Sequence, residues 1–228
     1  MRRLILSALL VVLAAGTAQA GSQQTGSTNS TGLLTRVRYV LDEPTAAFWS
    51  DAELLSWLNN GVEDIAARTK CLQASENATL RSGVVEYFVS SSYVGLTGAL
   101  YYNGSSYKAL DRANPFDPSK GIGNAQNVGE PVHYADWGGK VLLWPEPGSA
   151  VDGKTVSVFY VERPSRIASG DAVPVPAYLV NALEMYVASQ ALYKDRQDAR
   201  AAWYESKYKA EIDRYRSDYV EFSKEPAQ

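Results

Sequence analysis

The chain has 228 residues, enough for one domain with a hydrophobic core or for two small ones. Hydrophobic residues make up 46% of it and charged residues 21%, which is the composition of a folded protein and excludes general disorder. The formal net charge of −3 argues against a nucleic-acid coat held by phosphate contacts, although it is compatible with a protein that encloses DNA without gripping it. The single cysteine, Cys71, excludes an internal disulfide.

Residues 1–20 have the pattern of a secretory signal peptide. Two arginines precede an apolar run over residues 4–15, and Ala-Gln-Ala at residues 18–20 fits a small-x-small cleavage site. The run is too short for a comfortable membrane span, so no stable membrane anchoring is expected. The segment is either removed during export or retained as an apolar arm on a neighbouring subunit. Residues 21–32, which follow it, form a polar linker.

The clearest secondary-structure signal is a helix over residues 51–70. Ser50 stands where an N-cap is expected, and Glu53 follows three residues later, as a capping box requires. Apolar residues then recur every three or four positions, at Leu54, Leu55, Leu58, Val62 and Ile65. A shorter helical pattern over residues 33–41 ends before a proline, which cannot continue a helix. Together the two patterns predict a helical hairpin.

The middle of the chain has the signals of β-strands. Residues 100–107 predict a hairpin around Asn103-Gly104, a dipeptide that tolerates the positive φ of a type I′ turn. Residues 132–144 predict a second hairpin around Gly138-Gly139. Residues 155–161 are rich in β-branched and aromatic side chains and predict a further strand.

The last third of the chain returns to a helical pattern. Pro176 suits a first helical turn, and apolar residues then recur at helical spacing as far as Ala191. After a polar interruption at residues 195–198, an aromatic stripe steps by three or four positions through Ala201, Tyr204, Tyr208, Ile212, Tyr215, Tyr219 and Phe222. The stripe is either a helix–helix seam within the chain or a docking surface for a partner.

These patterns predict an α+β fold, in which a helical bundle formed by the N- and C-terminal helices carries an inserted antiparallel β region. The expected division of the chain is a signal-like segment at 1–20, a polar linker at 21–32, a helical hairpin at 33–75, a β-rich insertion at 76–170 and C-terminal helices that complete the bundle at 171–228.

Residues that could carry chemistry are few and poorly placed. His133 is the one histidine of the sequence, and strand alternation points Asp136, three residues on, to the opposite strand face. Gly121 and Gly123 begin like a dinucleotide fingerprint, but Gln126 stands where the third glycine or alanine belongs. The sequence has no phosphate-binding Gly-Lys-Ser/Thr loop and no His/Cys pair with zinc spacing. We therefore expect no catalytic residue, no cofactor and no metal site.

Four phrases of the sequence carry a resemblance to a known family. They are WSDAELLSWLNNGVEDIA at residues 49–66, VHYADWGGKVLLWPEP at 132–147, KTVSVFYVERP at 154–164 and VPVPAYLVNALEMYVASQALYKD at 173–195. In this order, and followed by a tyrosine-lined helix, they resemble the head-to-tail adaptor (connector) proteins of tailed bacteriophages. The resemblance covers about residues 33–220.

The resemblance implies a structural virion protein without enzymatic activity. Such adaptors form a ring, commonly a dodecamer, beneath the portal protein, extend the DNA channel and offer the surface on which the tail or nozzle protein is built. Their helical bundle makes subunit contacts, their C-terminal segments reach towards the portal, and their β part faces the tail. By position, Tyr208, Tyr215, Tyr219 and Phe222 are then candidates for portal or inter-subunit contact.

The same resemblance implies a location in the virion neck, assembly in the host cytoplasm, and DNA that passes through the lumen without sequence-specific binding. A rival interpretation is an exported periplasmic or surface binding module with a cleaved signal peptide. It rests on residues 1–20 and the polar linker, and it predicts a monomer that lacks that segment. A hydrolase of unrecognised type would need a pocket centred on His133 or on clustered carboxylates.

Overall fold

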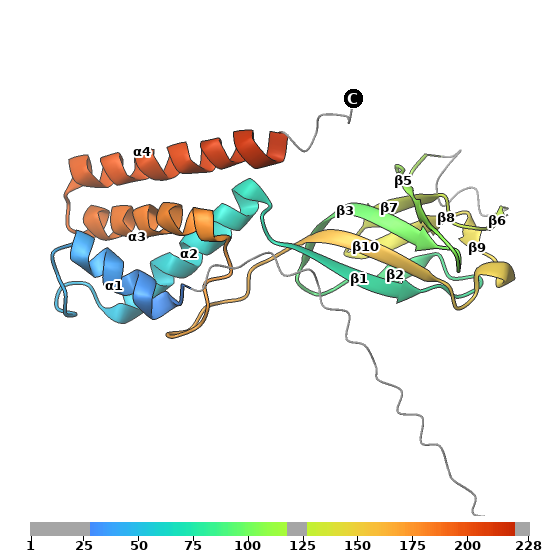
Figure 1. The fold of residues 1–228 in the computed structure, drawn as a ribbon, viewed down its shortest axis with the longest axis horizontal. Helices are drawn as coiled ribbons and strands as arrows, with labels where there is room; N and C mark the ends of the chain where they lie inside the picture. Colours follow the sequence, from blue (N-terminus) through green and yellow to red (C-terminus); the bar gives the residue numbers. More distant parts are fainter. Residues whose placement is uncertain (1–27, 118–126, 222–228) are drawn as a thin grey trace, which may run out of the picture.

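The computed structural model describes residues 28–117 and 127–221, so the signal-like segment at 1–20 and Phe222 lie outside the described residues. Two lobes, one helical and one built of strands, lie end to end (Figure 1). The helices are α1 (Ser30–Val40), α2 (Asp51–Thr69), α3 (Val180–Lys194) and α4 (Asp198–Tyr215), with 3₁₀ turns η2 (Ser149–Val151) and η3 (Ala177–Leu179) and the π-helical η4 (Arg216–Glu221).

The strands of the described residues are short except for two long ones. They are β1 (Gln73–Thr79), β2 (Glu86–Phe88), β3 (Tyr93–Tyr102), β4 (Tyr107–Ala109), β5 (Asp111–Arg112), β6 (Val128–Gly129), β7 (His133–Trp137), β8 (Lys140–Trp144), β9 (Glu146–Pro147) and β10 (Thr155–Glu162). All of them lie between α2 and η3 in the chain, so the strands are inserted between the two pairs of helices.

The helical lobe is centred on α3. In Figure 1, α4 lies along one side of α3, and α1 and α2 lie on the other. A helix enclosed in this way has buried residues on every side, and those of α3 are Val180, Ala182, Leu183, Val187, Ala188, Ser189, Ala191 and Leu192. Gly61 lets α2 approach α3 closely, because an added Cβ would lie 2.6 Å from Leu183 Cδ1 and 2.7 Å from Tyr186 Cδ1.

The two predicted helices of the N-terminal hairpin are both present. The capping box of α2 is confirmed, since the Glu53 backbone N–H donates to Ser50 Oγ (3.2 Å) and the Ser50 N–H donates to Glu53 Oε2 (3.1 Å). The helix ends where Lys70 takes the left-handed conformation, with φ at 52°. In the core between the hairpin and α3, the Trp49 indole N–H donates to the Ala191 carbonyl (2.9 Å).

Two buried polar side chains fasten the segment that returns from the β lobe to the helices. Asn59 Oδ1 accepts the Ile167 N–H (2.8 Å), and Asn59 Nδ2 donates to the Ile167 carbonyl (3.1 Å). Ser30 Oγ donates to the Ala168 carbonyl (2.9 Å) and accepts the Gly170 N–H (2.9 Å). Because buried polar groups are costly unless they are paired, these bonds hold the segment at one place on the bundle.

The β lobe consists of two four-stranded sheets that face each other. Their strand orders are β1-β10-β3-β4 and β2-β8-β7-β5, and β6 and β9 pair separately. Most neighbours are antiparallel, while β5 pairs with β7, and β6 with β9, in parallel. A common core joins the inner faces of both sheets and contains Leu80, Tyr101, Tyr134, Val141, Leu143, Val156 and Val158.

One predicted hairpin is confirmed and the other is wrong in its turn. Gly138 and Gly139, which connect β7 and β8, have φ values of 60° and 79°, as a type I′ turn requires. In the other hairpin the last pair is Tyr102 with Tyr107, so four residues, rather than two, connect β3 and β4. Asn103 closes this loop through its side chain, whose Oδ1 accepts two backbone N–H groups of the loop.

Strand β1 was missing from the sequence-based prediction. Its sequence, QASENAT, has one β-branched residue and no aromatic one, and the expected end of the helical hairpin at residue 75 falls inside it. The strand pairs with β10 along its whole length, from Gln73 opposite Val161 to Thr79 opposite Thr155. The partner strand therefore determines β1, and its own side chains do not.

The predicted α+β fold class is confirmed, because helices from both chain ends build one lobe and mostly antiparallel strands build the inserted one. The polar interruption at residues 195–198 is a turn. It separates α3, which ends at Lys194, from α4, which begins at Asp198, and Arg196 within it has a φ of 58°.

Candidate functional site

The aromatic stripe of α4 faces into the helical lobe. Tyr208 is 2% exposed, and its hydroxyl donates to Asp64 of α2, which also pairs with Arg68 (Oδ2 to Nε, 2.8 Å). Burial and this hydrogen bond to a carboxylate raise the pKa of Tyr208, so the hydroxyl stays protonated at neutral pH. The Tyr208 side chain therefore joins α4 to α2 within the chain, and its contact with a portal or a neighbour stays a prediction.

Tyr215 lies at the other end of the same stripe and is half-buried. Its ring stacks on that of Tyr178, with centroids 5.2 Å apart and planes at 17°. Since Tyr178 belongs to η3, the pair closes the end of the bundle that lies nearest to the β lobe (Figure 1). Tyr219 lies in η4, and Phe222 lies outside the described residues, so partner contacts of Tyr215, Tyr219 and Phe222 stay predictions.

The outward face of α4 carries an aromatic residue that the sequence analysis passed over. Trp203 is 54% exposed, its ring meets that of Tyr204 edge to face at 4.8 Å, and Lys207 Nζ lies 5.4 Å from its centroid. Arg200 lines a cavity of about 420 Å³ together with Trp203. Tryptophan and arginine side by side are typical of interface hot spots. The sequence signal that could have identified this residue is a tryptophan that lies off the apolar stripe, on an otherwise polar helix face.

The loop between α1 and α2 is held by a buried arginine. Arg38 Nη2 donates to the Trp49 carbonyl (2.9 Å), and Arg38 Nη1 donates to Glu43 Oε1 (3.2 Å). Desolvation opposes the charge of Glu43, but backbone N–H donors of the loop, including that of Phe48, and Arg38 hold its pKa below the ordinary value. The loop thereby presents Phe48 at the end of the helical lobe far from the strands, with Lys194 Nζ 4.8 Å from its ring centroid.

The sheet of β2, β8 and β7 presents aromatic side chains on its outer face. Phe88 and Trp137 both lie opposite Lys140 in the register, so the three side chains form one row. The next residue along β8, Val141, points into the core. Phe116 packs edge to face on Trp137 with centroids 4.9 Å apart, and Trp137 is 52% exposed. We call Phe88, Phe116 and Trp137 the aromatic face of the β lobe.

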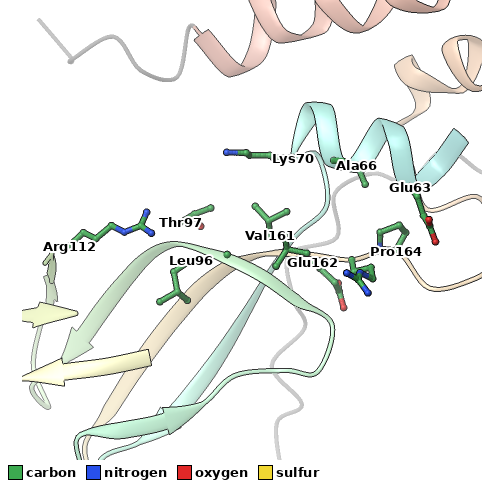
Figure 2. Close-up of a pocket in the computed structure, with 13 residues that line it drawn as sticks. Glu63, Ala66, Lys70, Leu96, Thr97, Arg112, Val161, Glu162 and Pro164 are labelled. Carbon is green, nitrogen blue, oxygen red and sulfur yellow. The ribbon is translucent and has the colours of Figure 1, made fainter. Parts of the chain in front are cut away.

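A cleft of about 650 Å³ lies between the two lobes (Figure 2). The C-terminal end of α2 forms one wall, and Figure 2 shows Ala66 and Lys70 there, across from Leu96 and Val161 of the β lobe. The charged residues that line this interlobe cleft are Glu63, Lys70, Arg112, Glu162 and Arg163.

Groups that could support catalysis do not converge in the described part of the chain. It contains no group of three or more His, Cys, Asp or Glu side chains that could hold a metal ion. His133 is in the outer-face row of β7, whereas Asp136 Oδ2 accepts the Leu96 N–H (3.4 Å) from the facing sheet. Cys71 is buried, and burial raises the pKa of its thiol.

The match to known families spans both lobes. A family model described as SU10 adaptor protein matches residues 28–224. The chain belongs to the SU10 adaptor protein family. The predicted relation to the head-to-tail adaptors of tailed bacteriophages is thus confirmed at the level of the family, and with it the expectation of an adaptor in a virion.

The other comparisons add little to the family match. No curated protein matches it. Among solved structures, it is similar to a chain in the neck of an empty GTA particle computed with C6 symmetry, at 12% identity, over 74% of this chain and 83% of the other, with a TM-score of 0.24. A TM-score this low carries no argument about fold or assembly. Within residues 28–117 and 127–221, no helix of the adaptor combines the length and apolar character of a membrane span.

Proposed function

We propose that this chain is a head-to-tail adaptor that forms a ring between the portal and the tail of a virion, extends the DNA channel and catalyses no reaction. The observation that carries the proposal is the family match over residues 28–224, because it includes the helical lobe and the β lobe together. The exposed aromatic side chains Phe48 and Trp203 belong to the helical lobe, and the aromatic face belongs to the β lobe. This separation supports the proposal, since a protein that joins two structures needs two separate contact surfaces.

The helical lobe is assigned the contacts with neighbouring subunits and with the portal. Trp203 and Phe48 are exposed there on rigid supports, one on a helix and one on a clamped loop. Aromatic side chains of this kind bury a large area at little cost in conformational entropy. Tyr215, Tyr219 and Phe222 extend the same assignment to the end of α4 that lies nearest to the strands.

The β lobe is assigned the contact with the tail or nozzle protein. Its aromatic face is part of a regular sheet, so Phe88 and Trp137 are held at fixed spacing. An adaptor of net charge −3 attracts the DNA backbone little, which suits a channel through which DNA slides without sequence-specific binding. The proposal includes a dodecameric ring and assembly in the host cytoplasm.

The test is the mass of the assembly formed by the purified chain, alone and with the portal protein of the same phage. Native mass spectrometry and electron microscopy are expected to find a closed ring, twelve-fold on the portal. A chain that stays monomeric and never binds the portal would overturn the proposal.

The intact mass of the protein taken from virions separates the rival interpretation. A mass near 24.9 kDa supports an adaptor that keeps its N-terminal segment. Absence of the chain from virions, together with a monomer that lacks residues 1–20, would favour the exported binding module.

A further inference from the structure

The larger sheet of the β lobe, with strand order β1-β10-β3-β4, ends in two different edge strands. The outer members are β1 and β4, and Figure 1 shows β1 along one side of the lobe, with β3 beyond β10 on the other. On its outer side, neither edge strand makes a backbone hydrogen bond to another described residue. An open edge accepts a further strand, so folded proteins either cover such edges or protect them with charges.

Each edge strand carries one charged residue on the face that points into the lobe. Glu76 of β1 lies opposite Val158, and both Val158 and its neighbours on that face belong to the core between the sheets. Lys108 of β4 lies opposite Tyr101, which belongs to the same core. Residues directly opposite each other share a face, so Glu76 and Lys108 are on the core-facing side, although both are exposed at the edge. Inward-pointing charges on edge strands oppose pairing with another edge.

The two charges have opposite signs, and this difference decides which edges can meet. Two β1 edges would bring Glu76 against Glu76, and two β4 edges would bring Lys108 against Lys108. Like charges placed opposite each other destabilise a sheet, whereas a β1 edge against a β4 edge brings a carboxylate to an ammonium group. The sheet thus disfavours symmetric pairs of identical edges and favours a head-to-tail pair, which is the type of contact that closes a ring.

Both charged groups are able to form this bond. Glu76 makes no ion pair with another described residue. Lys108 Nζ donates to Glu130 Oε2 (2.7 Å), but both side chains are about half exposed and an ammonium group has three donors, so a second carboxylate can join the pair. The rest of β1 contains no lysine or proline, and its register with β10 has no bulge, so nothing else in the strand opposes pairing.

The strand directions also continue across such a contact. Strand β1 is antiparallel to β10, β10 to β3, and β3 to β4, so β1 and β4 run in opposite directions within one chain. Copies related by a ring axis that follows the strands keep these directions. The β1 strand of one copy is then antiparallel to the β4 strand of the next, as neighbours within the sheet already are.

We infer that, in the ring, β1 of each copy pairs with β4 of the next copy as an antiparallel strand, with Glu76 beside Lys108 on the core-facing side. The occupant of the β1 edge is thus a second copy of this chain and not the portal or tail protein. The inference rests on the proposed ring and adds the β lobe to the contacts between neighbouring copies. The aromatic face, which lies on the other sheet, stays available for the tail.

Exchanging the two charges tests the dependence on their signs. Glu76→Lys and Lys108→Glu are each expected to raise the chain concentration needed for ring assembly about 10-fold, because each places like charges at every boundary between copies. The double variant restores opposite charges and is expected to assemble within about 3-fold of the parent concentration. Native mass spectrometry over a dilution series measures assembly, under the conditions in which the parent forms rings, and circular dichroism checks that each variant is folded.

Disulfide trapping tests the register of the two edges. Within one chain, residues 76 and 108 are three strand spacings apart, about 14 Å, so a disulfide between them joins two chains. Glu76→Cys with Lys108→Cys is expected to link chains into ladders under mild oxidation, at least about 10-fold faster on non-reducing gels than the control pair. The control is Ser75→Cys with Lys108→Cys, because Ser75 is equally exposed on β1 but points to the opposite face of the sheet. Cys71 stays in both variants, since it is buried.

The outcomes separate this contact from the ring itself. Rings that assemble equally well whatever the two charges, or ladders that form equally fast with both cysteine pairs, overturn the inference and leave the proposed function in place. A parent chain that forms no ring, alone or on the portal, overturns both. Weaker assembly of each single variant, recovery in the double variant and ladders specific to the first cysteine pair are the results expected.

Discussion

The two lobes fix the arrangement of their elements by different kinds of bond. Among the described residues, the buried polar or charged side chains all belong to the helical lobe and its attached segment, namely Ser30, Arg38, Asn59, Thr69 and Ser189. Each of them makes a hydrogen bond to a backbone carbonyl. The core of the β lobe is formed by aliphatic side chains and tyrosines, and its order comes from the pairing of β10 with β1 and β3.

The difference follows from what apolar contact can and cannot specify. Hydrophobic burial is non-directional, so helices that pack only through apolar faces can shift along one another. Directional bonds such as those of Asn59 to Ile167 fix the relative position of helices and connecting segments. Strands need no such additional bonds, because the alternation of apolar side chains between the two faces and the geometry of the turns set the register.

The largest expected effects come from truncating one buried leucine in the core of each lobe. Leu58 and Leu143 are both 0% exposed, in the separate cores of the helical lobe and the β lobe. Leu58→Ala and Leu143→Ala are each expected to lower the free energy of unfolding by about 2–5 kcal/mol. Hydrogen exchange read by mass spectrometry should lose protection mainly in the lobe that carries the change. Equal loss in both lobes would show that they unfold as one unit and would break the comparison.

The next effects concern binding rather than folding. Trp203→Ala and Trp137→Ala remove exposed side chains, so each is expected to change the free energy of unfolding by less than about 0.5 kcal/mol. Trp203→Ala should weaken ring or portal binding by about 2 kcal/mol, and Trp137→Ala should weaken tail binding to a similar degree. Each variant is the control for the other, in pull-down and electron microscopy of the complexes. If both weaken the same contact, the assignment of lobes to partners is wrong.

A smaller effect is expected from the hydroxyl that joins α4 to α2. Tyr208→Phe removes the hydrogen bond to Asp64 but keeps the ring in the core. The free energy of unfolding should fall by about 0.5–1.5 kcal/mol, measured by urea denaturation, because one hydrogen bond to a partly buried carboxylate is lost. Portal binding by the folded variant should be unchanged. Loss of binding without loss of stability would show that Tyr208 contacts a partner.

The smallest effect depends on pH. Lys194 Nζ donates to Glu53 Oε1 (2.7 Å), and this bond, together with the capping bonds from Ser50, lowers the pKa of Glu53 to about 2 from an ordinary 4.5. The folded pKa is below the unfolded one, so the stabilisation is present above about pH 4.5 and is lost as the pH falls towards 2. Glu53→Gln should therefore destabilise the helical lobe at pH 7 and approach the parent near pH 2 in thermal unfolding. A constant difference across that range would contradict the assignment.

Local signals in the sequence were enough for the elements whose bonds are local. The capping box at Ser50 and Glu53, the periodicity of α2 and the turn at Gly138-Gly139 all depend on residues within a few positions of one another, and all three are present in the structure. The same is true of the order of helices and strands, and hence of the α+β class. Family membership also followed from the sequence, through the order of its phrases.

The tertiary structure decided what depends on distant residues. Strand β1 exists because β10 pairs with it, and its own composition gives no signal. Tyr208 and Tyr215 belong to one stripe, yet the position of α2 buries the first, while the second stacks on Tyr178 at the bundle end. The interlobe cleft likewise has no local signal, since its walls come from α2, β3 and β10. A sequence period identifies the face of a helix that becomes buried, but the length over which a neighbour covers that face is set only when the helices pack.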